Sequence, residues 1–307
     1  MVLPISDAYQ SRSDNESAIL RRQDPVVYGR ADEPGLTEHQ LKAYLKNGFV
    51  FLKEFFRPDE VAVFLREARR LAADPAIGGR EEAIREPDSD QVRSIFAAHR
   101  LDPLFDRVAR DARLAAIARQ ILGSAVYVHQ SRLNLKPGFF GKDFYWHSDF
   151  ETWHVEDGMP RMRALSCTIL LTDNNELNGP LLLVPGSHTS YISCVGETPE
   201  DHYRASLKKQ ECGVPDPMSL GFLIERGGIR SMKGAAGSVI FFDCNTMHGS
   251  NSNISPYPRA NLFMVYNSVE NKLGAPRYGL KPRPEFIAAR EHTPPVEPAE
   301  TDYAAWR

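Results

Sequence analysis

One stretch decides which fold and which chemistry this chain can have: Tyr145-Trp146-His147-Ser148-Asp149-Phe150-Glu151-Thr152-Trp153-His154. His147 and Asp149 are two residues apart, so on an extended strand their side chains leave the same face. An imidazole and a carboxylate on one face supply two ligands of a 2-His-1-carboxylate triad, which holds Fe(II) and leaves positions open for oxygen chemistry. The spacing alone is a weak signal, because His-x-Asp also occurs by chance. The third ligand has to come from another strand.

A candidate for that ligand lies far downstream. His248 follows the apolar segment 239–242 and precedes a glycine, an arrangement that offers a ligand at the end of a strand. Arg259 comes soon after it, and by strand parity Arg259, Asn261 and Phe263 share one face. A guanidinium is suited to bidentate binding of a carboxylate. The sequence therefore predicts a metal site with an anion anchor near it, although an isolated arginine is more often a surface residue.

The apolar pattern indicates a mainly β protein with flanking α-helices. Helical spacing predicts helices over 37–48, 58–73 and 103–122, and Thr37 with Gln40 gives the first helix a capping box. From residue 126 the period changes to two. The predicted strands cover residues 49–52, 126–135, 165–172, 181–184, 238–243 and 261–269. Successive strands without intervening helices favour an antiparallel barrel or jelly roll, that is, a cupin-like double-stranded β-helix core.

Strand parity also divides the residues of the segment 126–135 between two faces. The first face carries Val126, Val128, Gln130, Arg132 and Asn134, and the second carries Tyr127, His129, Ser131, Leu133 and Leu135. The polar members of the first face are candidates for lining a site.

No convincing linker or internal repeat divides the chain, so we expect residues 1–307 to form a single domain. Residues 1–35 are polar and without a clean period, which predicts a loosely packed N-terminal arm. Residues 75–92 are charged and expected to form loop or exposed helix. The long insertion 195–236 has the features of a lid, and the Pro-rich segment 281–307 is expected to be an irregular tail.

Composition excludes several classes of protein. The chain has 307 residues, is 42% hydrophobic and 25% charged, and carries a net charge of −3. No basic field recruits nucleic acid or an anionic membrane, and the apolar runs are too short to span a bilayer. The N-terminus does not have the pattern of a signal peptide, so a cytoplasmic location is expected. The four cysteines have no zinc-site spacing, and we interpret Cys167 and Cys244 as buried thiols.

These motifs resemble a known family. The set His147-x-Asp149, His248 and Arg259 is similar to the site of the non-haem Fe(II), 2-oxoglutarate-dependent dioxygenases. The phytanoyl-CoA dioxygenase-like branch is further resembled by Asn47-Gly48-Phe49-Val50, by Gly179-Pro180-Leu181 and by Val184-Pro185-Gly186-Ser187-His188. The longer stretch 144–160 resembles the signature of the ectoine hydroxylases in that branch. The resemblance covers the chain from about residue 30 to 290.

The resemblance implies an enzyme that uses Fe(II), 2-oxoglutarate and O2 to hydroxylate ectoine to 5-hydroxyectoine, releasing succinate and CO2. It also implies a role in osmotic stress and a homodimeric state. The residues it assigns are His147, Asp149 and His248 to iron, Asn134, Ser250 and Arg259 to 2-oxoglutarate, and Gln130, Trp153, Phe242, Asn261 and Phe263 to ectoine. Ectoine carries an amidinium and a carboxylate, so aromatic faces and amide partners are chemically suitable.

Several alternatives remain open on the sequence. Phe242 and Phe263 would be core residues in most strands of this kind, and Trp153 could plug the end of a barrel. The role of Arg132 is either to bind a substrate carboxylate or to place a charge behind the ligands. Glu151, Asp157, His154 and His188 are interpreted as solvated, loop-bonding or turn-stabilising groups rather than ligands. At the level of function the alternatives are a sister enzyme acting on another small zwitterion or an acyl thioester, and a metal-bearing barrel without turnover.

Overall fold

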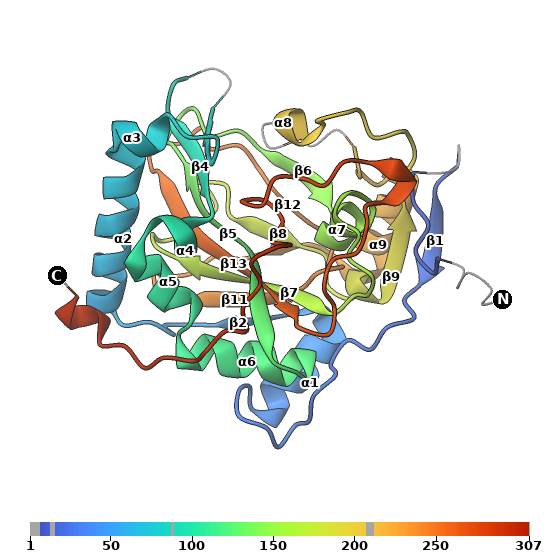
Figure 1. The fold of residues 1–307 in the computed structure, drawn as a ribbon, viewed down its shortest axis with the longest axis horizontal. Helices are drawn as coiled ribbons and strands as arrows, with labels where there is room; N and C mark the ends of the chain where they lie inside the picture. Colours follow the sequence, from blue (N-terminus) through green and yellow to red (C-terminus); the bar gives the residue numbers. More distant parts are fainter. Residues whose placement is uncertain (1–6, 13–15, 87–88, 207–211, 307) are drawn as a thin grey trace.

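Two antiparallel sheets form the centre of the molecule in this computed structural model, which describes residues 7–12, 16–86, 89–206 and 212–306 (Figure 1). The larger sheet has the strand order β2-β11-β7-β13-β5-β4-β3, the smaller sheet has the order β10-β8-β12-β6, and β1 pairs with β9. The strands are β1 Ala18–Arg21, β2 Phe49–Leu52, β3 Ala83–Arg85, β4 Val92–Phe96, β5 Val126–Lys136, β6 Phe144–His147, β7 Ala164–Leu170, β8 Leu181–Leu183, β9 Ser190–Ser193, β10 Arg230–Ser231, β11 Val239–Asp243, β12 His248–Ser250 and β13 Arg259–Ser268. This architecture confirms the predicted mainly β jelly roll with flanking helices.

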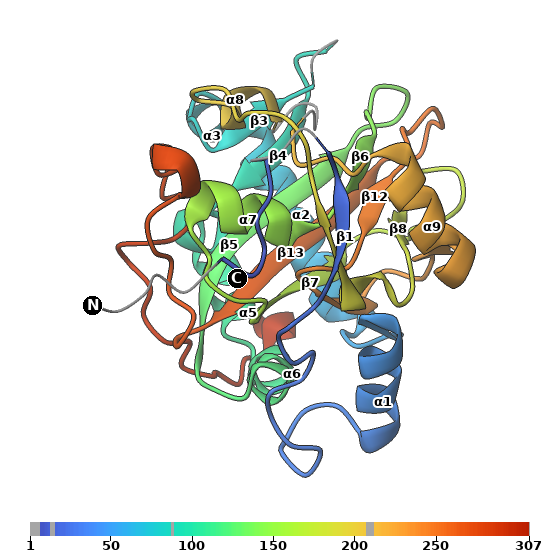
Figure 2. The same cartoon turned by 90° about the vertical axis from the view of Figure 1, so that its right-hand side faces the viewer.

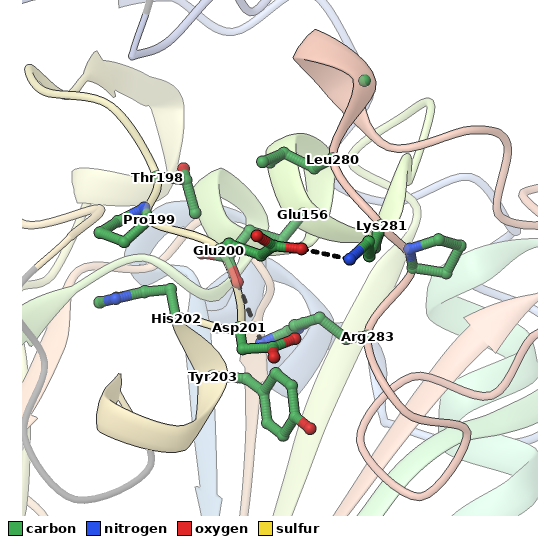
Figure 3. A pocket seen from close by; sticks show the side chains of 12 residues that line it. Glu156, Thr198, Pro199, Glu200, Asp201, His202, Tyr203, Leu280, Lys281 and Arg283 are labelled. Carbon is green, nitrogen blue, oxygen red and sulfur yellow. Dashed lines mark hydrogen bonds and ion pairs between the residues drawn. The ribbon is translucent and has the colours of Figure 1, made fainter.

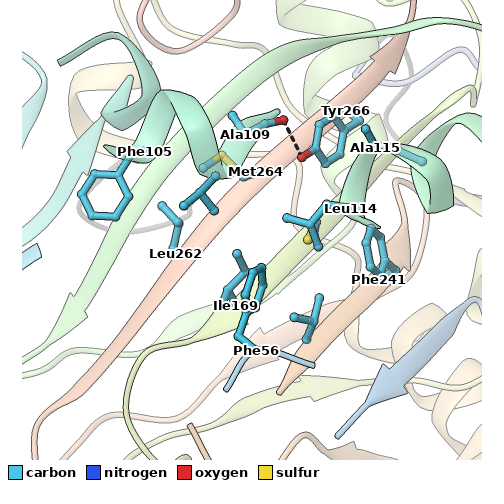
Figure 4. Packing of buried hydrophobic residues seen from close by; sticks show 14 of the residues in the cluster. Phe56, Phe105, Ala109, Leu114, Ala115, Ile169, Phe241, Leu262, Met264 and Tyr266 are labelled. Carbon is cyan, nitrogen blue, oxygen red and sulfur yellow. Dashed lines mark hydrogen bonds between the residues drawn. The ribbon is translucent and has the colours of Figure 1, made fainter. Parts of the chain in front are cut away.

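Some of the α-helices cover the outer face of the larger sheet, namely those whose apolar side chains belong to the core cluster there. The helices are α1 Glu38–Asn47, α2 Pro58–Ala73, α3 Pro75–Gly78, α4 Ala98–Leu101, α5 Pro103–Ala109, α6 Ala112–Leu122, α7 Asp149–Asp157, α8 Tyr203–Ser206 and α9 Pro217–Gly227. Apolar side chains of α5 and α6, such as Phe105 and Leu114, pack against Ile169, Leu262 and Phe241 of the strands (Figure 4). Burial of this cluster is the main stabilising contribution on that side of the sheet.

The inner face of the larger sheet packs against the smaller sheet. Leu181 and Leu183 of β8 form one buried cluster with Ile240 and Phe242 of β11 and Phe263 of β13. The two sheets therefore meet through these apolar side chains, and the space next to this cluster lies between strands of the smaller sheet and strands of the larger sheet.

Local signals in the sequence explain where the helix α1 begins and ends. Thr37 and Gln40 form the predicted capping box of α1, and Gly48 ends the helix in a left-handed conformation with φ 81°. A Cβ at Gly48 would lie 2.5 Å from Nδ1 of His188, so close packing also favours glycine there. His188 Nε2 lies 3.1 Å from the carbonyl oxygen of Leu45, which joins its turn to α1.

Two predicted segments differ in the structure. The single helix expected over 103–122 is divided into α5 and α6, because the Asp111 side chain accepts from Arg113 N and starts a second helix. Among residues 75–86 and 89–92, the short helix α3 agrees with the expected loop or exposed helix, but the prediction missed the strand β3 and the first residue of β4. β3 and β4 extend the larger sheet at its edge.

The predicted parity of β5 is interrupted by a bulge. Val265 of β13 pairs with Gln130 and Tyr266 pairs with Val128, so His129 has no partner in this ladder. One extra residue reverses the alternation. Val126 and Val128 therefore belong to the outer core with Leu133, whereas the prediction placed them on the face of Gln130.

The N-terminal arm packs closely, contrary to the prediction. Tyr9, Arg12, Arg22 and Asp24 are all buried, and β1 pairs with β9. Figure 2 shows the dark-blue arm beside α7. Within residues 281–306 the structure has one short 3-10 helix, Tyr303–Ala305, and Ile287, Val296 and Tyr303 are buried. None of the helices in the described ranges is long and apolar enough to span a membrane.

Candidate metal centre

The decisive stretch is a strand followed at once by a helix. β6 ends at His147, Ser148 caps the next helix by accepting a hydrogen bond from Glu151 N, and Asp149 is the first residue of α7. The prediction that His147 and Asp149 share one extended strand is therefore wrong. The turn at Ser148 nevertheless directs both side chains to the same point, and the helix then returns Trp153 toward it.

The structure brings the three predicted ligands together. One ligand atom from each of His147, Asp149 and His248 lies within 4.8 Å of the others. His147 and His248 are direct partners across β6 and β12, and Asp149 Oδ1 lies 3.8 Å from Nε2 of each. The Nδ1 atoms lie 2.7 Å from Tyr145 O and 3.0 Å from Thr246 O, which leaves both Nε2 atoms facing the shared point.

Neighbouring groups set the charge state of His147 and the orientation of Asp149 in a way that suits the binding of a cation. Burial, together with the adjacent His248, lowers the pKa of His147 to about 4, so the imidazole is neutral as a metal ligand requires. Ser166 donates a hydrogen bond of 3.1 Å to Asp149 Oδ2, which leaves Oδ1 for the cation. Two imidazoles whose Nε2 atoms face one point and one oriented carboxylate fit Fe(II) bound from one side.

A cavity of about 50 Å3 opens beside the cluster. Its walls include the predicted residues Gln130 and Trp153, the open candidate Arg132, and two tail residues, Arg283 and Ile287, that the sequence analysis did not name. Gln130 Nε2 donates to Ile287 O at 2.7 Å, which fixes the tail against β5. No local signal in the Pro-rich tail indicated this contact.

A second group of predicted residues gathers farther along β5 and β13. Arg259 donates to Asn134 Oδ1 and to the carbonyl oxygen of Gly179. Lys136, which the sequence analysis did not name, donates to Ser250 Oγ at 2.9 Å. The sequence had predicted Asn134, Ser250 and Arg259 to act together, and they do lie side by side.

Positive charge is in excess around Arg259 and Lys136, where β13 and β5 pair at the end of the site. Burial, followed by the nearby Arg132 and Arg93, lowers the pKa of Arg259, and burial with Arg259 lowers that of Lys136 well below its usual value. Arg93 is paired with Glu86 at 3.0 Å. The remaining buried cations repel one another, so an anion entering here is stabilised by charges already in place.

The remaining predicted residues lie between these two groups. Both amide atoms of the fully buried Asn261 are without a hydrogen-bond partner among the described residues, an arrangement that favours a polar ligand. The Phe242 ring lies 5.1 Å from the ring of His248, and the Arg132 guanidinium lies 4.8 Å from the centre of the Phe263 ring.

The carboxylates of α7 are not solvated, contrary to one interpretation of the sequence. Glu151 is 1% exposed and Asp157 is fully buried. Arg283 donates to both oxygens of Asp157 at 2.7 and 2.6 Å. His129, displaced by the bulge, packs edge-on against Trp153 with ring centres 5.2 Å apart.

Comparison with known proteins agrees with this site. The family model for phytanoyl-CoA dioxygenase (PhyH) matches residues 44–261. An ectoine dioxygenase of Bordetella bronchiseptica is 65% identical over 302 residues, which cover 98% of each chain. The crystal structure of EctD from S. alaskensis with 2-oxoglutarate and 5-hydroxyectoine is 46% identical, covers 97% of this chain and 99% of its own, and has a TM-score of 0.88. The same protein with bound Fe is 45% identical over the same coverage, with a TM-score of 0.87. The chain therefore belongs to the phytanoyl-CoA dioxygenase family and, within it, to the ectoine dioxygenases.

Proposed function

We propose that this chain hydroxylates ectoine to 5-hydroxyectoine in a reaction that consumes 2-oxoglutarate and O2 and releases succinate and CO2. The observation that carries the proposal is the convergence of His147, Asp149 and His248 at the cavity lined by Gln130 and Trp153. The likeness to EctD with 2-oxoglutarate and 5-hydroxyectoine supports the same substrates for this chain.

The residues proposed to hold iron are His147 and His248 through Nε2 and Asp149 through Oδ1. When bound there, Fe(II) activates O2 at the expense of 2-oxoglutarate and delivers one oxygen atom to the substrate carbon. The chain's own contribution is to keep the imidazole of His147 neutral, to orient both imidazoles, and to place the C–H bond of the substrate beside the metal.

The proposed site for 2-oxoglutarate is the cationic end near Arg259. Arg259 Nε is buried and without a hydrogen-bond partner among the described residues, so one edge of the guanidinium is free for a carboxylate. Asn134 orients the other edge, and Lys136 with Ser250 adds a cation and a hydroxyl nearby. A dicarboxylate bound between this end and the iron offsets the excess of positive charge.

Ectoine is proposed to lie beside the iron, against Gln130, Trp153, Phe242, Asn261 and Phe263. Aromatic faces suit the amidinium, and the amides of Gln130 and Asn261 offer partners to groups that lose water on binding. Arg283 lines the same cavity while it is paired with Asp157, and its guanidinium is proposed as the partner of a substrate carboxylate. Arg132 lines the cavity at the metal and lies beside Phe263, so it is proposed to place a positive charge near the part of either substrate that approaches the iron.

The insertion 195–236 is proposed to cover the substrate side. Its segment 198–203 and the tail segment 279–283 enclose a cavity of about 270 Å3, and Arg283 lines both this cavity and the one at the metal (Figure 3). A single domain over residues 1–307 is likewise proposed, since the arm, the insertion and the tail all contact the central sheets or α7.

We also propose a cytoplasmic homodimer that produces a compatible solute under osmotic stress. Exposed apolar side chains support a self-association surface, because Phe139, Phe140, Ile254 and Tyr257 lie on two loops joined by the Gly141–Asn253 bridge. Light scattering of the purified chain, compared with an Ile254→Glu variant, measures the oligomeric state. A monomer in both samples would contradict the dimer.

Turnover with defined substrates tests the main proposal. The purified chain is supplied with Fe(II), 2-oxoglutarate and O2, and with ectoine, proline or an acyl-CoA in separate reactions. Formation of 5-hydroxyectoine with equal amounts of succinate is expected with ectoine, and no such product is expected from His248→Ala. Succinate release that is faster with proline or the acyl-CoA would assign the chain to a sister activity. A chain that binds iron and ectoine without producing succinate would be a binding protein.

A further inference from the structure

Arg12, in the N-terminal arm, joins three parts of the chain that are distant in sequence. Its Nε and Nη2 atoms donate to the two oxygens of Glu151 at 2.9 and 2.7 Å, and its Nη1 atom donates to Glu156 at 2.7 Å. Nη1 also donates to Thr198 Oγ1 of the insertion at 2.7 Å. Arg12 is 5% exposed, so these contacts are made out of water. Charge-assisted bonds in such a place are strong and directional.

The insertion also contacts the Arg12–Glu151 ion pair at a second point, Gly213. A Cβ at Gly213 would lie 2.4 Å from Glu151 Oε2 and 2.6 Å from Arg12 Nη2. Gly213 has φ 68°, so any side chain there would also strain the backbone. The backbone of the insertion therefore covers the Arg12–Glu151 pair directly, and only glycine permits this approach.

The start of α7 does not depend on Arg12. Asp149 is held by the hydroxyl of Ser166 at 3.1 Å, and Phe150 N donates to the carbonyl oxygen of Cys244 at 2.8 Å. Ser148 caps the helix. These contacts come from β7 and from the loop after β11, so the proposed iron ligand is fixed without the arm.

The rest of α7 carries the groups on the substrate side. Thr152 and Trp153 line the cavity at the metal, and Asp157 holds Arg283 through both carboxylate oxygens. Glu156 lies between the Thr198 segment and the Arg283 segment, 3.7 Å from Arg283 Nη1 (Figure 3). Arg12 binds Glu151 and Glu156, which lie before and after Thr152 and Trp153 on the helix. Its contacts therefore act on the part of α7 that contains these two cavity residues.

The buried carboxylates of α7 require the positive charge that Arg12 of the N-terminal arm supplies. Glu151 and Glu156 are 1% and 4% exposed, and a buried carboxylate requires a partner. Burial raises the pKa of Glu151, but the charge and hydrogen bonds of Arg12, with the hydroxyl of Ser11, reverse this and lower it overall. Without Arg12, α7 would carry uncompensated negative charge beside the site.

We propose that Arg12 is a positioning residue for substrate recognition, which fastens the insertion to the second half of α7 and so holds Trp153 and Arg283 in place. The inference rests on the proposed function for the identity of the substrate, but not for the mechanical role. Arg12 touches neither the metal ligands nor the cationic end near Arg259. Its loss is expected to affect ectoine and to leave iron and 2-oxoglutarate binding unchanged.

The test compares Arg12→Gln with Arg30→Gln, a control in the same arm whose guanidinium is exposed and pairs with Asp32. Arg12→Gln should raise the KM for ectoine by about tenfold, the effect of one lost interaction of hydrogen-bond strength. The yield of 5-hydroxyectoine per succinate should fall. Half-saturation by Fe(II) and by 2-oxoglutarate, measured anaerobically by absorbance, should stay within about twofold of wild type. Arg30→Gln should match the wild type throughout.

Two further variants keep the test valid if Arg12→Gln unfolds. The double variant Arg12→Gln/Glu151→Gln removes the unpaired carboxylate, so it should regain stability but keep the high KM for ectoine. Gly213→Ala disturbs the contact between the insertion and the Arg12–Glu151 pair without changing any charge, and it should also raise the KM for ectoine. A folded double variant with wild-type KM and product yield would overturn the proposal. Equal loss of iron and 2-oxoglutarate binding would also overturn it, since the role would then be general stability.

Hydrogen exchange separates this inference from the choice of substrate. In the protein without substrate, Arg12→Gln should speed amide exchange over residues 153–157 and leave exchange at 149–150 unchanged. This result would hold even if ectoine were not the substrate, in which case wild-type turnover would fail while the exchange pattern remained. Uniform exchange over the whole of α7 would refute a separate hold on its second half.

Discussion

Arg259 provides the most direct test of how 2-oxoglutarate is bound. Two of its nitrogens are engaged by Gly179 O and Asn134 Oδ1, and Nε has no partner among the described residues. The free edge of the guanidinium is therefore the Nε side. We expect Arg259→Gln to weaken 2-oxoglutarate binding strongly and Arg259→Lys to weaken it less, because lysine keeps the charge but loses the planar pair of donors.

The magnitude follows from the number of charge-assisted bonds that each variant loses. One such bond contributes about 1.5–3 kcal/mol, and paired bonds are not fully additive. Loss of the pair in Arg259→Gln should cost about 3 kcal/mol, or roughly 150-fold in the dissociation constant. Loss of one bond in Arg259→Lys should cost about 1.5 kcal/mol, or roughly tenfold. Lys136 remains in both variants, so binding should weaken rather than vanish.

The assay is anaerobic titration of the Fe(II)-loaded protein with 2-oxoglutarate, followed by absorbance and by calorimetry. The KM for ectoine is measured in parallel at saturating 2-oxoglutarate, where it should change little. Arg30→Gln serves as an exposed control. Unchanged 2-oxoglutarate affinity in Arg259→Gln, together with a large loss in Arg132→Gln, would refute the assignment and transfer the anchor to Arg132.

The other predictions concern the metal, the substrate, acid stability and the insertion. Replacing His248 by Ala should abolish hydroxylation and greatly weaken iron binding, and full activity in that variant would exclude the triad. Trp153→Leu should cost about 1–3 kcal/mol in ectoine recognition with iron and 2-oxoglutarate binding unchanged; a loss of stability with normal product yield would make Trp153 a plug. Burial lowers the pKa of His99 to about 3 and that of His129 to about 4, so both stay neutral when the unfolded chain takes up protons below about pH 6.5. Their contribution to stability is therefore complete above that pH and falls on acidification, by about 2 kcal/mol each at pH 5, and a flat unfolding free energy between pH 7 and 5 would contradict it. Residues 195–206 should exchange amide hydrogens more slowly when ectoine and 2-oxoglutarate are bound, and equal protection in both states would rule out a lid.

Much of the fold could be predicted because its signals are local. The capping box at Thr37, the glycine after α1 and the change of apolar period at Val126 each depend on a few neighbouring residues. The helix α7 was missed for the opposite reason. Residues Asp149–Asp157 are nearly all buried, so they have no polar face to give a helical period, and only the Ser148 cap indicated a helix.

The arm and the bulge depend on contacts that no local pattern reveals. Arg12 is charged and lies in a polar segment, and its burial depends on Glu151, which is 139 residues away. The bulge at His129 appears only when β5 is paired with β13. A register shift of this kind cannot be read from one strand alone.

The same limit applies to the site. Spacing suggested His147, Asp149, His248 and Arg259 only weakly, and the resemblance of the longer stretch 144–160 to the ectoine hydroxylases was needed to select them. Arg283 lies in an irregular tail, where neither period nor motif separates a cavity residue from a surface one. Its position is decided by Asp157 at the end of α7, another long-range ion pair.

The pairing of His147 with His248 makes the metal a cross-link. Each histidine is a rung of the ladder between β6 and β12, and Asp149 adds α7 to the same point. Iron held there links two short strands to a helix whose first residue, Asp149, is one of the ligands, much as a disulfide cross-links a small domain. Cells short of iron would then hold a chain whose smaller sheet is less firmly closed, and proteases would find their first cleavage sites there. Supply of the metal would set the lifetime of the protein as well as its activity.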